Sequence, residues 1–447
     1  MYHKIAEKLS NKHIAILGFG REGKSTYRFI KKYCQNTIIT IIDYNDIKSD
    51  FYKEFSDNIE FVFGDNYLDN LNKYDLIIKT PGISLKDIDI SSIRNKISSQ
   101  VELLLEVYKD NCIGVTGTKG KSTTSSLIYK ILKDQNKDVY LVGNIGRPVL
   151  DEIEKYTNES LIVIELSSHQ LEFLNVSPHI GLILNLFEDH LDHAGSLYHY
   201  HHIKLNMFKN QDKDDIGIYN FDNEYLKKYI DEENFDSKLF AISMEEKKDT
   251  FKKDNNIFFE NSLLYDCNSD RLLLGNHNLI NITFSLVVAF LLKLDLEKAT
   301  ESINTFKPLE YRIQYVGKCN DINFYVDTLA TIPEATIQSI ETLKNVDTLI
   351  FGGMDRGIDY QSLIDYLNNS SINNLICMPS TGYKIGKQIK DKNIYYISDL
   401  KEAVEKAKDI TAKDRICLLS PAAPSYEYFK NYQEKAEAFI KYVKDNK

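Results

Sequence analysis

The sequence predicts an α/β protein of three domains in which parallel strands alternate with helices. With 447 residues the chain is too long for one hydrophobic core, and the usual domain size gives about three domains. Short apolar runs typical of buried strands alternate with amphipathic helical stretches. Polar, glycine-bearing clusters follow many of these runs, at the position where ligands bind in open parallel sheets.

Residues 1–100 predict a Rossmann-like N-terminal domain. We expect its strands at four apolar runs, residues 13–17, 37–42, 59–63 and 75–79. The glycine-rich run 18–23 follows the first strand and Asp43 closes the second, as in a dinucleotide-binding fingerprint. Thr80 follows the fourth strand and is expected at the same edge of the sheet.

Residues 101–307 predict a central domain of the P-loop ATPase type. A strand ending near Val115, a glycine-bearing turn at 116–120 and a helix opening at Lys121 form a phosphate loop. Lys121 would bring positive charge to the β- and γ-phosphates, and the Ser122 hydroxyl would bind Mg²⁺. Further strands are expected at 138–142, 161–164, 180–184, 238–242 and 257–260, before an apolar helix that reaches residue 294.

Two loops could bind phosphate, and their surroundings distinguish them. Residues 18–25 match GxxxxGK[ST] literally, whereas the loop 116–122 has Val115 where the first glycine belongs. We nevertheless favour ATP at 116–122, because a downstream strand ends in Glu165, an acid suited to a metal ion. The first loop is instead followed by Asp43 at a strand end, which suits a ribose edge. ATP and NAD both remain alternatives at 18–25.

Residues 308–447 predict a Rossmann-like C-terminal domain. Its strands are expected at 322–326, 348–351, 375–378, 394–397 and 416–419. Thr331, Arg356 and Ser425 lie in loops that follow three of these strands, where they could meet a ligand.

The composition excludes several classes of protein. The chain has 55 Lys and Arg residues against 65 Asp and Glu residues, which gives a net charge of −10. It therefore lacks the excess of positive charge that is typical of a nucleic-acid binder. The six cysteines are scattered without a CxxC pair, which is typical of reduced, buried thiols. We see no secretory signal and no apolar run long enough to span a bilayer. We therefore expect a cytoplasmic protein without nucleic-acid or membrane partners. We also expect a monomer, although the sequence does not give the oligomeric state.

Five of the ten histidines lie between His190 and His202. Clustered histidines suggest a transition metal, but the neighbouring Asp and Glu, with no cysteine nearby, favour hard cations. His190 follows a strand on the nucleotide side, whereas we expect the other four to be partly exposed: His193, His199, His201 and His202. Spacing alone gives no reason to single out Lys204.

In their order along the chain, these clusters resemble the Mur ligase family. The resemblance covers the whole chain and rests on the runs 18–23, 80–83, 116–123, 143–146, 165–170, 188–192, 275–278, 311–312, 352–353 and 419–422. It implies three domains, for a UDP-sugar, for ATP and for an incoming amino acid. Within the family the chain is most similar to the ligases that add D-glutamate to UDP-N-acetylmuramoyl-L-alanine through an acyl phosphate in peptidoglycan synthesis.

The resemblance also implies roles for individual residues. ATP would be bound by Gly117, Thr118, Lys119, Gly120, Lys121, Ser122, Thr123, Asn281, Arg312 and Asp327. The UDP-sugar and the amino acid would be bound by Gly18, Gly20, Arg21, Glu22, Gly23, Asp43, Thr80, Asn144, Ser167, Thr331, Arg356 and Ser425. Two Mg²⁺ ions would be held by Ser122, Glu165, His190 and a carbamylated Lys204. The catalytic residues would be Lys121, His190 and Lys204.

Two departures from the family pattern concern the amino acid. Leu329 stands where the family has a lysine near glutamate, and Arg356 stands where a lysine is common. Arginine can grip a carboxylate with two parallel hydrogen bonds, so Arg356 could replace the lost charge. L-Glutamate or a folylpolyglutamate-type substrate therefore remains an alternative, as does a nucleotide-binding protein that performs no ligation.

Overall fold

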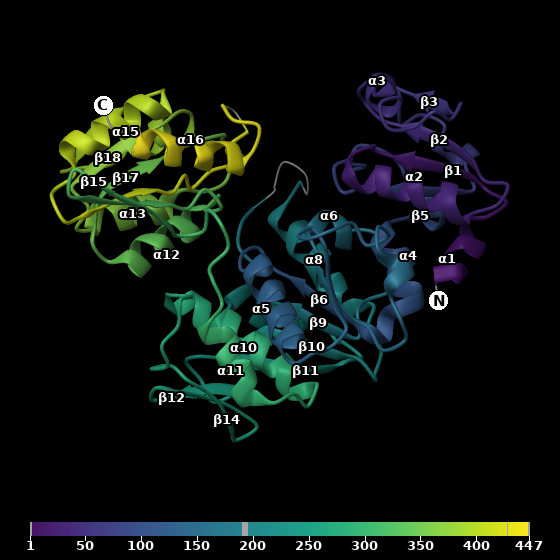
Figure 1. Ribbon diagram of the computed structural model, residues 1–447, viewed down its shortest axis with the longest axis horizontal. Coiled ribbons are helices and arrows are strands. Elements are labelled where there is room, and N and C mark those ends of the chain that lie inside the picture. The colour runs from purple at the N-terminus through teal and green to yellow at the C-terminus, as the bar shows by residue number, and fades with distance from the viewer. Residues whose placement is uncertain (1, 190–194, 427, 446–447) are drawn as a thin grey trace. The chain divides into compact units, whose positions relative to one another are not determined.

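The computed structural model describes residues 2–189, 195–426 and 428–445. The chain forms two compact units. The first comprises Met1–Leu186, His193–Asn268 and Asn281–Ile303, and the second comprises Phe187–Asp192, Ser269–Ile280 and Asn304–Lys447. The strands of the described residues form three sheets, one in each predicted domain (Figure 1). The α/β class and the three-part organisation are confirmed, while the boundaries at residues 100 and 307 stay a prediction.

The first sheet is parallel throughout and has the order β3-β2-β1-β4-β5. Its strands are β1 (His13–Leu17), β2 (Ile38–Ile42), β3 (Glu60–Val62), β4 (Leu76–Lys79) and β5 (Ile97–Ser98). The helices are α1 (Tyr2–Leu9), α2 (Arg21–Tyr33), α3 (Lys48–Phe51) and α4 (Gln100–Tyr108). The four predicted strands are confirmed. The strand order reverses between β1 and β4, so a crevice for a ligand is expected at their carboxyl ends.

The middle sheet has the order β14-β13-β12-β11-β10-β9-β6-β8-β7. Its strands are β6 (Cys112–Thr116), β7 (Val139–Gly143), β8 (Leu161–Glu165), β9 (Ile180–Ile183), β10 (Ile216–Asn220), β11 (Lys238–Ser243), β12 (Thr250–Lys253), β13 (Asn256–Phe259) and β14 (Ser262–Asp266). The helices are α5 (Lys121–Asp134), α6 (Ser168–Leu171), α8 (Leu197–Lys209), α9 (Glu224–Glu232), α10 (Asn276–Leu291) and α11 (Leu296–Asn304). The pairs β12–β13 and β13–β14 are antiparallel, and the other pairs are parallel.

Two glycines of the middle sheet bring α8 close to the end of β6. A Cβ atom on Gly114 of β6 would lie 3.1 Å from the Met207 Sδ atom, and one on Gly181 of β9 would lie 2.9 Å from the Met207 Cγ atom. A larger residue at either position would push α8 away from the sheet, because the interior is already close-packed. Lys204, one turn before Met207, is thereby held near the carboxyl end of β6.

The third sheet has the order β15-β16-β20-β17-β18-β19, and only its β15–β16 pair is antiparallel among the described strands. Its strands are β15 (Gln314–Cys319), β16 (Ile322–Val326), β17 (Val346–Phe351), β18 (Asn374–Cys377), β19 (Asn393–Tyr396) and β20 (Ile416–Leu419). One face is covered by α12 (Pro333–Leu343), α13 (Gln361–Asn369) and α14 (Thr381–Gly386). The other face is covered by α15 (Leu400–Ile410) and α16 (Tyr432–Lys444) (Figure 1).

The sequence pattern missed the more polar strands. The stretch 211–265 contains β10, β12 and β14 in addition to the two predicted strands, and β12 carries two exposed lysines at its end. β12 and the edge strand β14 carry exposed side chains, so they lack a continuous apolar run, whereas β10 lies inside the sheet and is mostly buried. All six cysteines are free thiols, as expected. No helix in the described ranges has the length and apolar character needed to cross a membrane.

We predict that Gly23→Ala destabilises the first unit by about 1–3 kcal/mol, because the added Cβ atom overpacks the β1–α2 turn. This atom would lie 2.2 Å from the backbone oxygen of Gly18. Gly20→Ala is the matched control, since its Cβ atom would meet no other atom within 4 Å. Thermal unfolding should show a lower melting temperature for Gly23→Ala alone. Equal melting temperatures for the two variants would contradict this packing role.

Candidate active site

A tight turn between β6 and α5 forms the predicted phosphate loop. Gly117 and Gly120 have φ angles of +145° and +86°, and a Cβ atom on Gly120 would lie 2.6 Å from the Asn281 Oδ1 atom. Only glycine adopts these angles without strain, and it also leaves room for Asn281. Asn281 accepts a hydrogen bond from the Thr124 hydroxyl at 3.2 Å. The structure therefore places the predicted residue Asn281 against the loop.

Asn185, two residues after the end of β9, supports the loop. The Thr118 N–H donates to the backbone oxygen of Asn185 at 3.0 Å, and the Lys119 N–H donates to its side-chain oxygen at 2.8 Å. The Asn185 amide donates in return to the Lys119 carbonyl at 3.0 Å. Sequence reasoning did not assign this role, although Asn185 follows a predicted strand at the same edge of the sheet.

Lys121 and Lys204 converge on one carbonyl oxygen. The Lys121 ammonium donates to the oxygens of Gly117 and Thr118, both at 2.9 Å. The Lys204 ammonium, on α8, donates to the same Gly117 oxygen at 3.2 Å. Lys204 is only 1% exposed, and its ammonium lies 4.8 Å from the ring centre of Tyr200. Two cations around one loop carbonyl create a positive potential that suits a polyphosphate.

Glu165 ends β8 beside the phosphate loop, where its register partner on β6 is Val115. Its side chain is buried, and its Oε1 atom accepts a hydrogen bond from the Asn144 amide at 2.7 Å. Its Oε2 atom is buried without a hydrogen-bond partner among the described residues. A buried carboxylate oxygen is costly to leave unsatisfied, and hard cations such as Mg²⁺ bind such oxygens. Glu165 therefore has the environment of a metal ligand.

The literal GxxxxGK[ST] run has a different environment. The Lys24 ammonium forms an ion pair with Glu54 on the surface. Arg21 donates to the backbone oxygens of Gly143, Asn144 and Gly146 at 3.2–3.4 Å, which ties the start of α2 to the turn after β7. At Gly117 two lysines donate to one backbone carbonyl. Among the described residues, no pair of lysines does so at this loop.

A cavity of about 510 Å³ opens at the carboxyl ends of β1, β2 and β4. The predicted residues that line it are Gly18, Gly20, Arg21, Glu22, Asp43, Thr80 and Asn144. Asp43 is fixed at its floor, because its two oxygens accept hydrogen bonds from the N–H groups of Phe19 at 2.9 Å and Asn45 at 3.1 Å. Tyr44 and Tyr67 also line the cavity, with ring centres 6.0 Å apart. Sequence reasoning missed both rings, although Tyr44 directly follows Asp43.

Glu22 links this cavity to the loop after β8. The Gln170 amide donates to the Glu22 carboxyl at 2.9 Å, while the Gln170 side-chain oxygen accepts hydrogen bonds from the N–H and hydroxyl of Ser167. Burial raises the pKa of Glu22 to about 7, against the opposing effects of the Gln170 hydrogen bond and of the charges on Arg21 and Lys79. The predicted residues Glu22 and Ser167 thus belong to one hydrogen-bonded chain.

The second unit brings three predicted residues to one sheet edge. Thr331, Arg356 and Ser425 follow β16, β17 and β20, which are neighbours in the third sheet with parallel directions. The Arg356 guanidinium lies 3.3 Å from the carboxylate of Asp189. The Ser425 hydroxyl is buried and has no hydrogen-bond partner among the described residues.

Arg312 and Asp327 form an ion pair in the second unit, with an N–O distance of 3.6 Å. Asp327 is buried and accepts a hydrogen bond from the Ser339 hydroxyl. Burial, aided by the charge of Arg312, lowers the pKa of His277 to about 4. His190 and His193 lie outside the described residues. Of the other histidines expected to be partly exposed, His201 is instead fully buried, because it packs on the inner side of α8 against Tyr229.

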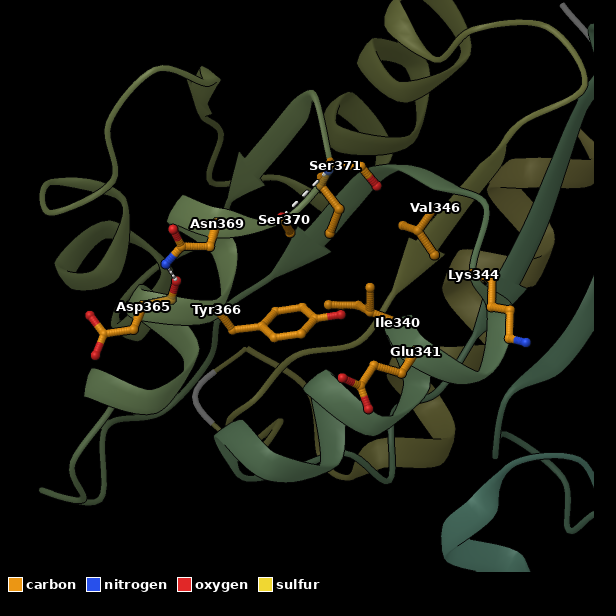
Figure 2. A pocket seen from close by; sticks show the side chains of 10 residues that line it. Ile340, Glu341, Lys344, Val346, Asp365, Tyr366, Asn369, Ser370 and Ser371 are labelled. Atoms are coloured by element: carbon orange, nitrogen blue, oxygen red, sulfur yellow. Dashed lines mark hydrogen bonds between the residues drawn. The ribbon is translucent and has the colours of Figure 1, made fainter.

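Another cavity, of about 660 Å³, lies on the third sheet and is drawn in Figure 2. Its lining includes Tyr366 and Asn369 of α13 and Val346 at the start of β17 (Figure 2). This is the amino end of β17, whereas Arg356 follows its carboxyl end. The cavity is therefore separate from the loops that carry the predicted ligand-binding residues.

Family models match three parts of the chain. The model described as the MurD-like N-terminal domain of Mur ligases matches residues 12–102, the Mur ligase middle domain matches 115–289, and the Mur ligase glutamate ligase domain matches 311–423. The chain is 31% identical to the UDP-N-acetylmuramoylalanine–D-glutamate ligase of Clostridioides difficile over 451 residues, covering 98% of both chains. It is also 31% identical to the enzyme of that name from Oenococcus oeni over 443 residues, covering 97% of both.

Solved structures share this fold. A MurF from Acinetobacter baumannii matches with a TM-score of 0.64 at 13% identity, covering 98% of both chains. A MurF ligase from Thermotoga maritima in complex with ADP matches with a TM-score of 0.61 at 17% identity, covering 98% of this chain and 96% of that one.

We predict that Glu22→Gln makes the melting temperature less dependent on pH between about 4.5 and 7. The folded-state pKa of Glu22 is raised to about 7 from an ordinary value of 4.5, so the folded protein holds this proton more tightly than the unfolded chain. The corresponding stability is present below pH 4.5 and is lost as the pH rises through 7. Melting curves at pH 5 and pH 8 should show the wild type losing more stability than the variant. Equal losses of stability in the wild type and in Glu22→Gln would refute the raised pKa of Glu22 in the folded protein.

Proposed function

Because the chain belongs to the Mur ligase family, we propose that it is an ATP-dependent ligase that adds D-glutamate to UDP-N-acetylmuramoyl-L-alanine in peptidoglycan synthesis. The observation that carries this proposal is the convergence of Lys121 and Lys204 on the Gly117 oxygen, with Glu165 at the neighbouring strand end. The names of the relatives support D-glutamate as the amino acid. We assign the reaction to a monomer in the cytoplasm.

The reaction needs an activated carboxyl group, because a free carboxylate has no adequate leaving group. Transfer of the γ-phosphoryl group of ATP to the alanyl carboxylate gives an acyl phosphate and ADP. The amine of glutamate then attacks the acyl carbon, and the amide forms as the nitrogen loses a proton and phosphate leaves from the tetrahedral intermediate. Enzymes accelerate both steps mainly by positioning the reactants and neutralising developing charge.

The phosphate loop would hold the triphosphate. Its backbone N–H groups and the start of α5 would face the phosphates, and Lys121 would exchange its loop carbonyls for phosphate oxygens. The adenine would lie near Asn281, and the pair Arg312–Asp327 would meet the nucleotide from the third domain. The remaining members of this ATP site are Gly117, Thr118, Lys119, Gly120, Ser122 and Thr123.

The donor set fits magnesium. The Glu165 Oε2 atom is buried without a hydrogen-bond partner among the described residues, and the Ser122 hydroxyl opens α5 at the same edge. Glu165 and Ser122 would hold one Mg²⁺, while His190 and Lys204 would hold a second. Bound Mg²⁺ would neutralise charge on the transferred phosphoryl group.

Lys204 would act as a carbamate. Addition of carbon dioxide to its neutral amine, with loss of a proton, converts a cation into a group with two metal-binding oxygens. Its burial beside the phosphate loop supports this role, because a permanent ammonium is costly at a site only 1% exposed.

The first domain would bind the UDP-sugar, and the third would bind glutamate. The cavity of about 510 Å³ has the volume for a nucleotide-sized ligand, with the start of α2 at its edge. The predicted residue Gly23 packs under this turn. Thr331, Arg356 and Ser425 would bind glutamate. The proposed domain ranges are 1–100, 101–307 and 308–447.

L-Glutamate is the second candidate, because Leu329 and Arg356 depart from the family pattern at this position. We expect phosphate release from ATP in the presence of UDP-N-acetylmuramoyl-L-alanine and D-glutamate, and little with L-glutamate. A colorimetric phosphate assay across both enantiomers measures this directly. Turnover with L-glutamate alone would show that L-glutamate, not D-glutamate, is the substrate. No turnover with any amino acid would contradict the ligase activity.

We predict that Lys204→Ala lowers kcat by about 100-fold or more, since charge stabilisation in the transition state is lost. Lys209→Ala is the matched control, because Lys209 lies on the same helix and pairs with Glu233 on the surface. Removing bicarbonate should slow the wild type and leave Lys204→Ala unchanged. Full activity of Lys204→Ala with no response to bicarbonate would refute the carbamate.

A further inference from the structure

Lys435 is a buried cation that the proposed reaction does not use. It lies in the first turns of α16 and is 3% exposed. Its ammonium donates to the Gly352 carbonyl at 2.9 Å, and no carboxylate of the described residues lies within ion-pair distance of it. Burial lowers its pKa to about 8. A cation is unfavourable both in an apolar interior and near the N-terminus of a helix, so this placement calls for an explanation.

The carbonyl that Lys435 binds belongs to a tightly held turn after β17. Gly352 has a φ angle of +123°, and a Cβ atom on Gly353 would lie 2.3 Å from the Pro424 oxygen. The Gly352 N–H donates to the Pro421 oxygen at 2.9 Å, and the Met354 N–H donates to the Pro424 oxygen at 3.0 Å. The turn is therefore joined directly to the loop after β20.

These two loops carry two of the residues assigned to glutamate. Arg356 follows Met354 by two residues, and Ser425 directly follows Pro424. A shift of the Gly352 carbonyl would move both side chains, because the Gly352–Pro421 and Met354–Pro424 hydrogen bonds couple the loops. The Lys435 ammonium approaches the turn from α16, on the face of the third sheet opposite to α12 and α13.

We propose that Lys435 is a positioning residue for the acceptor amino acid. It holds the Gly352 carbonyl and, through this carbonyl, the loops that carry Arg356 and Ser425. This inference rests on the proposed function. A charged donor is suited to this task, since hydrogen bonds from an ammonium to a carbonyl are stronger than neutral ones. Lys435 contacts the loop rather than the substrate, so its loss should weaken glutamate binding more than it slows the chemistry.

The test compares three variants of the full-length protein. Lys435→Met removes the ammonium while keeping an unbranched apolar chain, and Lys435→Arg keeps the charge. Lys408→Met is the matched control, because Lys408 is also largely buried and also binds α16. It binds the other end of the helix, where its ammonium donates to the backbone oxygens of Tyr442 and Asp445 at 2.9 and 3.1 Å. Circular dichroism and thermal melting first establish that each variant is folded.

For Lys435→Met we expect the KM for glutamate to rise about tenfold, because a charged hydrogen bond that acts on binding is lost. The kcat should stay within about twofold of the wild-type value, and the KM for ATP should be unchanged. Lys435→Arg should restore most of the glutamate KM, and Lys408→Met should leave it unchanged. An unchanged KM in folded Lys435→Met, or an equal rise in Lys408→Met, would overturn the proposal. Absence of glutamate-dependent turnover in the wild type would instead refute the proposed function.

Discussion

The proposed nucleotide site of the central domain depends on one carbonyl oxygen, that of Gly117, which accepts hydrogen bonds from two lysines. Lys121 comes from the loop itself and Lys204 from a helix more than eighty residues away in the sequence. Two cations that share one carbonyl create a positive potential at the loop. An anion at this place would be stabilised by both cations, which is the physical basis for a triphosphate site.

Several packing constraints serve this convergence. Gly114 and Gly181 let Met207 approach the sheet, which fixes α8 and with it Lys204. Asn185 holds the backbone of the turn from β9. The third domain contains a comparable lysine–carbonyl hydrogen bond, in which the Lys435 ammonium donates to the carbonyl of Gly352. In both domains a lysine on a helix binds the carbonyl of a glycine turn that follows a buried strand, so a helix positions the turn.

Much of this arrangement could be predicted from the sequence because it is local. The strands β1, β16 and β20 are rich in apolar residues, and their predicted and observed bounds agree. Glu165 could be named because it ends an apolar strand, and Lys121 because it follows the short glycine turn after another. Lys204 could be named only from the family resemblance, and Asn185 and Lys435 were not assigned a role, since these roles depend on helix packing and strand order that no local pattern encodes. Strands with exposed polar residues, such as β12, were missed because they lack a continuous apolar run. His201 was misjudged because its burial depends on Tyr229.

The central claim is that ATP binds at the loop before Lys121, although the literal phosphate-loop motif ends at Lys24 and Ser25. Isothermal titration of a non-hydrolysable ATP analogue into Lys121→Ala and Lys24→Ala tests it most directly. We expect Lys121→Ala to lose most of its affinity and Lys24→Ala, whose ammonium pairs with Glu54, to bind as the wild type does. Wild-type affinity in Lys121→Ala together with lost binding in Lys24→Ala would contradict the account.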